Sequence, residues 1–279
     1  MTNSRRTWAE ISVSAALHNF NFFKNTASSS KIMAVVKANA YGHSALDLAP
    51  IYETNGADFF GVACLQEALE LRKIGITKPI LILGYTDVNV AQLLAENNVS
   101  QCVYSLEYAE MLSKVAKEND FNLNIHIKID SGMSRLGFDC RDNDFNGINE
   151  IINTLKLPNL NFEGIFTHFA VADREIETED GFTDEQYDRF FKATEILKEK
   201  GFVPQYRHCC NSAGILNDTD KHLDMVRPGI ALYGHYPGPS CEGLDGPGLL
   251  PVMTLKSRVA AVRDLPENTP VSYGCTARF

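Results

Sequence analysis

Short apolar segments alternate along this chain with longer amphipathic ones, and this alternation limits its fold more than any other feature. Eight segments of strand length carry the β-branched and apolar residues typical of buried parallel strands. They are residues 32–36, 59–63, 80–83, 99–104, 124–129, 162–166, 206–210 and 223–227. Amphipathic segments of helix length lie between most of them; residues 183–200, for example, repeat apolar side chains such as Phe190 and Leu197 on one helical face. Eight strands with seven such connections predict an α/β fold of the (β/α)8 TIM-barrel type.

The same alternation also fits a doubly wound sheet, because periodicity does not show whether a sheet closes. The length of 279 residues suits one α/β barrel of about 250 residues or two domains of about 150. A stretch rich in glycine and proline near residues 236–250 can continue neither a helix nor a strand, so it indicates a boundary. We expect a barrel domain over residues 1–240, with a leading strand able to pair with the second domain, and the start of a β-rich domain over residues 241–279.

Charge and composition disfavour several classes of protein. The chain has 26 basic and 35 acidic residues, whereas a nucleic-acid binder needs a basic face to neutralise phosphates. The apolar runs are of strand length, well short of the roughly 18 residues of a membrane span, and the first residues lack the apolar core of a signal peptide. Seven cysteines form no CxxC pair and leave one over, which favours reduced thiols. We therefore expect a cytoplasmic protein with no nucleic-acid or membrane partner.

Polar and cationic residues follow five of the eight predicted strands. In an α/β barrel, the C-terminal ends of the strands carry the functional site. The strand-end groups are Lys37 and Tyr41 for the first strand, Lys128 and Arg135 for the fifth, His168 for the sixth, Asn211 and Ser212 for the seventh, and Arg227, Gly229 and Ile230 for the eighth. Chance would place one or two such groups at strand ends, so five predict a common site.

Each group also has a simpler explanation when it is taken alone. A lysine that closes a strand is usually a solvated end, His168 suits the edge of a core, and the Asn211–Ser212 pair suits a helix cap. The alternation of His126 and Lys128 is ordinary strand geometry. The histidines are too scattered for a recognised metal-ligand spacing, so no metal is expected. Glycine-rich nucleotide fingerprints are absent from the sequence.

A specific chemistry nevertheless connects the strand ends. Lys37 follows an apolar strand and precedes Gly42, and a lysine in a desolvated barrel mouth loses basicity and becomes nucleophilic. The loops after the seventh and eighth strands offer backbone N–H groups to a phosphate. A reactive lysine with a phosphate site is what an aldehyde-bearing phosphate cofactor requires, so these residues predict pyridoxal 5'-phosphate bound to Lys37 as a Schiff base. The substrate stays open on these grounds.

Six sequence blocks resemble those of the alanine racemases, fold-type III enzymes that use pyridoxal phosphate. They are AVVKANAYGH at 34–43, KIDSGMSRLG at 128–137, THFA at 167–170, HCCNSA at 208–213, MVRPGIALYG at 225–234 and VSYG at 271–274. The blocks occur in family order over nearly the whole chain. One block alone could also occur in small pyridoxal-phosphate-binding barrel proteins or in basic-amino-acid decarboxylases, and the last block separates the chain from the first of these groups.

The resemblance assigns roles to the strand-end residues. It implies that Lys37 holds the cofactor as an internal aldimine and is one of two bases, while Tyr273, acting from the partner subunit, is the other. The phosphate would be bound by Tyr41, Ser212, Gly229 and Ile230, in the loop that begins at Asn211. Arg135 would contact the substrate carboxylate, and Lys128 occupies the position that some members carbamylate. Arg227 would face the pyridine nitrogen, with His168 bonded to it.

The implied activity is the interconversion of L- and D-alanine by two-base proton transfer at Cα in a homodimer, which supplies D-alanine for peptidoglycan. Two alternatives remain: a non-catalytic pyridoxal phosphate carrier or inactive racemase fragment, and a racemase of serine or another small amino acid. The sequence departs from the family at Ser44, where many members have glycine. It also ends six residues after Tyr273, whereas members carry a further β-rich domain, so we expect a shortened form.

Overall fold

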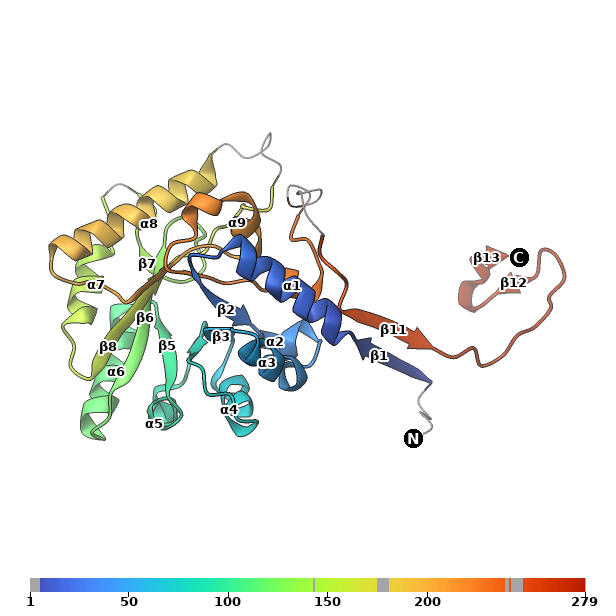
Figure 1. The fold of residues 1–279 in the computed structure, drawn as a ribbon, viewed down its shortest axis with the longest axis horizontal. Coiled ribbons are helices and arrows are strands. Elements are labelled where there is room, and N and C mark those ends of the chain that lie inside the picture. Colours follow the sequence, from blue (N-terminus) through green and yellow to red (C-terminus); the bar gives the residue numbers. More distant parts are fainter. Residues whose placement is uncertain (1–5, 143, 175–180, 239–240, 242–247, 279) are drawn as a thin grey trace. The chain divides into compact units, whose positions relative to one another are not determined.

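The structure is a computed structural model that describes residues 6–142, 144–174, 181–238, 241 and 248–278 (Figure 1). The chain divides into two compact units. One unit is Ser12–Val252, and the other joins Met1–Ile11 to Met253–Phe279. The domain division predicted at residue 240 stays a prediction, and residues 239–240 and 242–247 of the predicted boundary lie outside the described residues.

The larger unit is built on a parallel sheet that closes on itself. Its strands lie in the order β10, β2, β3, β4, β5, β6, β8, β9, and every neighbouring pair is parallel. Their bounds are β2 (Lys31–Val35), β3 (Phe59–Val62), β4 (Ile80–Ile82), β5 (Val99–Val103), β6 (Leu123–Asp130), β8 (Leu160–Phe166), β9 (Tyr206–His208) and β10 (Met225–Val226). The short β7 (Phe138–Asp139) pairs with β6.

Two backbone hydrogen bonds join the ends of this strand order. Asp224 N donates to Arg207 O at 3.2 Å, and Arg227 N donates to Cys210 O at 3.1 Å, so the segments that contain β9 and β10 lie side by side. Neighbouring strands follow the chain order around the sheet, without the reversal of a doubly wound fold. The predicted (β/α)8 TIM-type barrel is confirmed.

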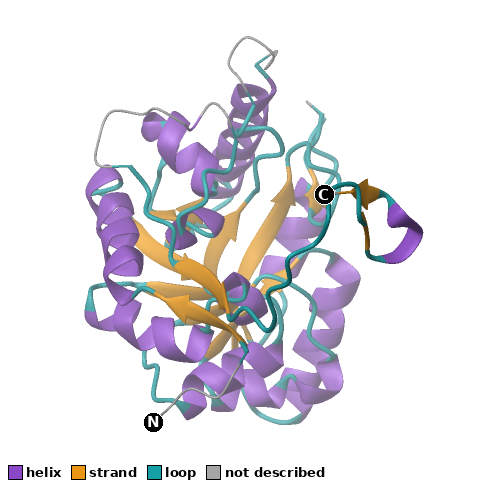
Figure 2. Ribbon diagram, turned by 90° about the vertical axis from the view of Figure 1, so that its right-hand side faces the viewer, coloured by secondary structure: helices purple, strands orange, loops and turns teal. Residues whose placement is uncertain are grey.

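Helices surround the strands of this unit (Figure 2). They are α1 (Val13–Thr26), α2 (Lys37–Tyr41), α3 (Ala45–Thr54), α4 (Leu65–Lys73), α5 (Gln92–Glu96), α6 (Leu106–Glu118), α7 (Ile148–Leu155), α8 (Phe182–Glu199) and α9 (Ser212–Asn217). Three of them begin at a polar cap whose side chain accepts from a backbone N–H: Ser12 before α1, Ser105 before α6 and Asn211 before α9. These caps satisfy amide groups that a helix start leaves without a partner. No helix within the described residues is both long and apolar enough to cross a membrane.

Apolar side chains from neighbouring strands fill the barrel interior. Met33, Phe59, Leu81 and Met225 form a cluster in which each residue is at most 2% exposed. This layer packs the inside of β2, β3, β4 and the β10 end of the sheet, as expected for a barrel of eight strands. The barrel is therefore a closed core, and open space for a ligand is confined to its end.

The last strand is shorter than the sequence indicates. The segment predicted at 223–227 forms a strand only at Met225–Val226. Leu223 has a φ of 53°, which is outside the strand region, and Arg227 precedes Pro228, which has no N–H for a ladder. The chain therefore leaves the sheet at Arg227 and turns toward the end of the barrel.

The smaller unit contains short antiparallel pairs. β1 (Thr7–Ile11) pairs with β11 (Met253–Ser257), with Thr7 opposite Ser257. β12 (Pro270–Val271) pairs with β13 (Ala277–Arg278), and a 3₁₀ turn over Tyr273–Cys275 lies between them. Most described side chains of this unit from Thr254 onward are exposed.

Arg72 at the end of α4 holds the loops that lead into two neighbouring strands. Its guanidinium donates to the carbonyl oxygens of Ile76 and Lys78 before β4, each at 2.8 Å. It also donates to those of Asn97 at 2.7 Å and Asn98 at 2.8 Å before β5. One side chain thus satisfies four backbone acceptors that belong to no regular ladder.

We expect the substitution Arg72→Met to lower the free energy of unfolding by about 2–3 kcal/mol, because charge-assisted hydrogen bonds to these carbonyls would be lost. Urea denaturation of the two proteins measures the difference. The neighbouring exposed substitution Lys73→Met is the control and should change the value by less than about 0.5 kcal/mol. Equal effects of the two substitutions would contradict this role of Arg72.

Candidate active site

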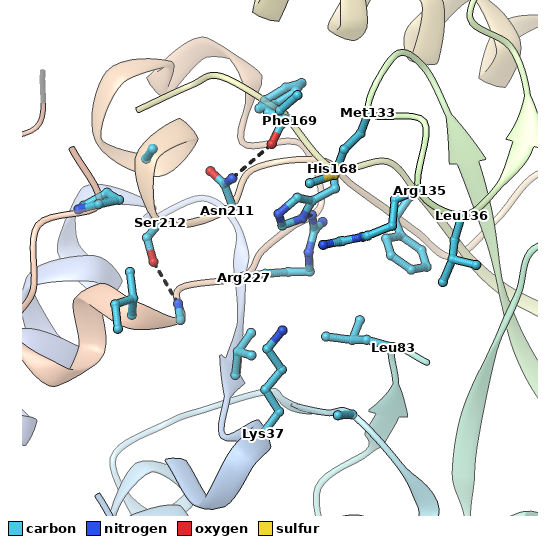
Figure 3. A pocket seen from close by; sticks show the side chains of 18 of the residues that line it. Lys37, Leu83, Met133, Arg135, Leu136, His168, Phe169, Asn211, Ser212 and Arg227 are labelled. Carbon is cyan, nitrogen blue, oxygen red and sulfur yellow. Dashed lines mark hydrogen bonds between the residues drawn. The ribbon is translucent and has the colours of Figure 1, made fainter. Parts of the chain in front are cut away.

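A cavity of about 460 Å³ opens where the barrel strands end (Figure 3). Ten of the eleven predicted site residues line it, and they come from segments up to 193 residues apart in the sequence. They are Lys37, Tyr41, Lys128, Arg135, His168, Asn211, Ser212, Arg227, Gly229 and Ile230. Parallel strands bring their carboxyl ends to the same end of a barrel, which is why residues so distant in sequence meet there.

Lys37 directly follows β2, and the chain after it takes an unusual path. Residues 38–41 have φ between 51° and 55°, a left-handed turn built without glycine. Such backbone costs roughly 1 kcal/mol or more per L-residue, and strain of this kind gathers at functional sites. The turn is held by Asn39, whose side chain accepts from Ala45 N at 2.8 Å, and by Glu67, which accepts from Ala38 N at 2.7 Å.

The turn sets the place of Lys37 and Tyr41 in the cavity. The Lys37 Nζ lies 5.9 Å from the centroid of the Tyr41 ring, and Figure 3 shows the lysine side chain extended toward Arg227. Ser44 at the end of the turn has a φ of 71°, which glycine adopts at no steric cost. Serine in place of the glycine found in many family members therefore strains the backbone at this position.

The Lys37 amine is electrostatically disfavoured as a cation. Burial lowers its pKa, and the positive charge of Arg135 lowers it further, while Glu67 acts in the opposite direction. A larger share of neutral amine makes this lysine a better nucleophile than a solvated one. The arrangement can form and break a bond to an electrophilic carbon, as a Schiff-base lysine does.

Lys128 is a second perturbed amine in the same cavity. Its residue is 6% exposed, and its Nζ lies 4.9 Å from the centroid of the Phe166 ring. Burial first, and then the charges of Arg227 and Arg135, lower its pKa to about 7. Near neutral pH about half of this amine is therefore unprotonated.

The loops after β9 and β10 meet through Ser212. Its Oγ accepts from Gly229 N at 2.9 Å and from Ala231 N at 3.4 Å, which leaves its own hydrogen to donate to an oxygen in the cavity. A Cβ on Gly229 would lie 2.9 Å from the Tyr41 hydroxyl, so only glycine allows this close approach. Asn211 accepts from Gly214 N at 3.0 Å and donates to Phe169 O at 3.4 Å.

Arg227 is buried at the inner wall of the cavity. Its Nη2 donates to the carbonyl oxygens of Thr167 at 2.8 Å and Cys209 at 2.9 Å, and lies 3.3 Å from His168 Nδ1. Its Nη1 lies 2.9 Å from His208 Nδ1. The sequence analysis did not single out His208, although it lies in the predicted seventh strand and could have been found by asking which of its residues point inward.

The histidines beside Arg227 are neutral. Burial, and then the charge of Arg227, lower the pKa of His168 and of His208 well below the usual value. Burial also lowers the pKa of Arg227 itself, to about 10, which the Cys209 and Cys210 thiols partly oppose. At neutral pH the guanidinium therefore keeps its charge, and the imidazoles accept its hydrogen bonds.

Arg135 lies in the loop after β6 and is exposed, so it can meet a ligand that enters the cavity. Asp130 shapes this loop because its Oδ1 accepts from Gly132 N at 3.0 Å and Ser134 N at 2.9 Å. Tyr273 belongs to the smaller unit, where its side chain is fully exposed. Its role as a base stays a prediction.

The fold and this cavity define a class of protein: an α/β-barrel enzyme with two lysines of lowered pKa and a buried guanidinium in its cavity. The model of the alanine racemase N-terminal domain matches residues 11–237. The alanine racemase of Methanococcus maripaludis is 43% identical over 274 residues, which cover 98% of this chain and 72% of that protein. That of Clostridium tetani is 42% identical, covering 97% of this chain and 68% of the relative. The chain belongs to the alanine racemase family.

Solved structures agree with this assignment. The alanine racemase of Clostridium difficile 630 superimposes with a TM-score of 0.89 at 37% identity, covering 99% of this chain and 70% of that chain. That of Bacillus anthracis, solved with bound L-Ala-P, has a TM-score of 0.88 at 35% identity and covers 100% and 70%. A histidine racemase from Leuconostoc mesenteroides gives 0.86 at 30% identity and covers 99% and 72%.

The pKa of Lys128 predicts a pH-dependent contribution to stability. The folded state holds this amine at a pKa of about 7, below the value of about 10.4 in an unfolded chain. Between these values the unfolded state binds more protons, so stability rises with pH. We expect the free energy of unfolding of the wild type, relative to Lys128→Met, to rise by about 1 kcal/mol per pH unit from pH 7.5 to 9.5.

Urea denaturation in buffer free of carbon dioxide measures this difference, since carbon dioxide would react with the free amine. The exposed substitution Lys117→Met provides the control and should leave the pH dependence of the wild type unchanged. A wild type and a Lys128→Met variant with parallel pH profiles would show that the amine is not perturbed.

Proposed function

We propose that this chain is an alanine racemase that interconverts L- and D-alanine with pyridoxal 5'-phosphate as its cofactor. One observation carries the proposal: the Lys37 amine, with its lowered pKa, faces the same cavity as a buried guanidinium whose described hydrogen-bond partners are imidazoles and carbonyls. The amine suits the aldehyde of the cofactor, and the guanidinium suits its ring nitrogen. Family membership supports the same reaction.

The residues of the cavity fit pyridoxal phosphate on physical grounds. Ser212 has a hydroxyl hydrogen to donate, and Gly229 allows backbone close to the Tyr41 hydroxyl, as a phosphate site requires. These residues, with Asn211 and Ile230, would hold the phosphate. When bound, pyridoxal phosphate withdraws electrons from the substrate and so acidifies its α-hydrogen.

Racemisation needs a proton removed from one face of Cα and returned to the other. A single base cannot easily serve both faces, so a second group is required. We infer that Lys37 serves one face and that Tyr273 of a second copy of this chain serves the other, which makes the active form a homodimer. The lowered pKa of Lys37 supports its part, because a base works best when its pKa is near the working pH.

Arg227 would suppress a competing reaction. Because its pKa stays at about 10, it donates a hydrogen bond at neutral pH without giving up its proton. Because Arg227 would not transfer its proton to the ring nitrogen, the cofactor ring would withdraw electrons less strongly than a protonated ring. With pyridoxal phosphate bound, Arg227 would thereby favour racemisation over transamination.

Arg135 and Lys128 would act on the substrate side. The exposed guanidinium of Arg135 suits the carboxylate of alanine. The neutral form of the buried Lys128 amine, favoured by its lowered pKa, can add to carbon dioxide to give a carbamate and release one proton to solvent. This change would replace a positive charge with a negative one that pairs with Arg135, and so would orient the guanidinium.

The setting of this activity follows from the family. We propose a cytoplasmic enzyme whose D-alanine serves peptidoglycan synthesis. The similarity to a histidine racemase favours one alternative, a racemase of another amino acid. A panel that includes serine and histidine, analysed by chiral chromatography, separates these substrates from alanine. A non-catalytic carrier would bind the cofactor yet exchange no α-hydrogen of alanine with deuterated solvent.

Incubation of L-alanine with the chain and pyridoxal phosphate tests the proposal. Chiral analysis should show equal amounts of the two enantiomers at equilibrium. Lys37→Ala should lose both this conversion and the visible absorption of the lysine-bound cofactor, because the amine that would bond to the aldehyde is removed. Lys117→Met serves as the control. A Lys37→Ala protein with an unchanged spectrum would rule out Lys37 as the attachment site.

Tyr273→Phe tests the second base. The rates at which L- and D-alanine exchange their α-hydrogen with deuterated solvent should become unequal, because only one face loses its proton-transfer group. Nuclear magnetic resonance follows both exchanges. Tyr85→Phe, another exposed tyrosine, should keep the two rates balanced. Equal losses from both enantiomers in Tyr273→Phe would argue against a base for one face.

A further inference from the structure

A chain of hydrogen bonds leads from Arg227 through the barrel interior to a carboxylate. His208 Nδ1 lies 2.9 Å from Arg227 Nη1, and His208 Nε2 lies 2.9 Å from His126 Nδ1. His126 Nε2 lies 3.1 Å from Glu163 Oε2, which also accepts a short hydrogen bond from Ser100 Oγ. His208 and His126 have no exposed surface, and the Glu163 side chain is 14% exposed.

The direction of every bond in this chain follows from its two ends. Arg227 has only donors, so the Nδ1 atom of His208 must accept. Neutral His208 then carries its hydrogen on Nε2 and donates to Nδ1 of His126. The hydrogen of His126 is therefore on Nε2, where Glu163 accepts it. A guanidinium at one end and a carboxylate at the other permit this single arrangement of tautomers.

A local irregularity of the sheet places Glu163 at the end of the chain. Ile125 on β6 is opposite Phe162 on β8, but His126 is opposite Gly164, so Glu163 is an extra residue in β8. Such bulges re-aim side chains and often lie near active sites. A Cβ on Gly164 would overlap the His126 ring, so glycine is needed for the imidazole to occupy this position.

Packing and charge keep the groups in this state. The His208 ring stacks on Phe166 at 4.8 Å with an angle of 3° between the rings. Burial alone would raise the pKa of Glu163, but its hydrogen bond and electrostatic interaction with His126, and then the hydrogen bond from Ser100, lower it, which favours the ionised carboxylate. A buried hydrogen-bond chain is rigid when every donor and acceptor in it has a partner. Removing one of its side chains leaves buried polar groups without partners, which is energetically costly.

We propose that Glu163 is a positioning residue that acts on Arg227 through His126 and His208. Arg227 sets which imidazole nitrogens accept, and Glu163 accepts the hydrogen that this leaves on His126 Nε2, so it stabilises the arrangement that holds the guanidinium plane at the cavity wall. A carboxylate in direct contact would occupy further guanidinium hydrogens, whereas this distant one leaves for a ligand those that the described partners of Nη1 and Nη2 do not use. The proposal rests on the proposed function, in which Arg227 faces the ring nitrogen of pyridoxal phosphate.

Nitrogen NMR of the full chain with ¹⁵N-labelled histidine tests the hydrogen-bond chain directly, before and after addition of pyridoxal phosphate. The wild type should show His126 and His208 neutral, each with its hydrogen on Nε2. Glu163→Gln should keep these tautomers, because its amide oxygen accepts the same bond without charge. Glu163→Leu should shift the ring signals of both histidines. A hydrogen on Nδ1 of His208, in the wild type or in Glu163→Gln, would overturn the proposal.

Kinetics test the effect on Arg227. In Glu163→Leu the kcat for racemisation should fall about tenfold with little change in KM for alanine, the size expected when a buried donor loses its acceptor. The share of transamination should rise, and Glu163→Gln should restore both values. Glu110→Leu, an exposed glutamate on α6, is the matched control. Wild-type kinetics in Glu163→Leu, or a Glu163→Gln variant as impaired as Glu163→Leu, would also overturn the proposal.

The two proposals fail in different ways. If the wild type racemises no alanine, the proposed function is wrong, yet the tautomers still report on the link from Glu163 to Arg227. If the wild type racemises alanine but carries the wrong tautomers, the proposed function stands and the positioning role falls. Should Glu163→Leu not fold, the tautomers of the wild type and the behaviour of Glu163→Gln decide alone.

Discussion

A buried positive charge, with no carboxylate among its described hydrogen-bond partners, organises the site of this protein. Burying a guanidinium is costly unless each donor is satisfied. Here the carbonyl oxygens of Thr167 and Cys209 and two neutral imidazoles accept from Arg227. Burial lowers the pKa of His168, His208 and Lys128, and the charge of Arg227 lowers each of them further. The electrostatic character of the cavity therefore depends on this one residue.

Barrel closure explains how much of this site could be predicted from sequence. Lys37, Lys128, His168 and Arg227 stand at or just after strands whose apolar runs are plain, and parallel strands end on one side. The strand count places them at one edge of a parallel sheet, and closure of that sheet brings them into one cavity. The partner of each residue does not, because partners depend on which side chains face inward and on which strands are neighbours in the closed sheet.

The residues that sequence reasoning missed illustrate this limit. The sequence analysis explained His126 by ordinary strand alternation, and His126 does lie in a strand. Its contact with Glu163 arises from a bulge in β8 that the sequence pattern does not indicate. His208 needed the neighbouring position of β10 to meet Arg227. The hydrogen-bond partners of His126 and His208 depend on tertiary structure, so no local sequence pattern predicts them. The role of Tyr273 rests on a second copy of the chain, which lies beyond any single-chain pattern.

The left-handed turn after Lys37 was equally hidden, since residues 38–41 include no glycine to signal it. Its backbone angles are close to the mirror image of an ordinary right-handed helix. That conformation is strained for an L-residue and relaxed for its enantiomer. The chain thus sets Ala38 and Ala40 in a shape that D-alanine would adopt without strain.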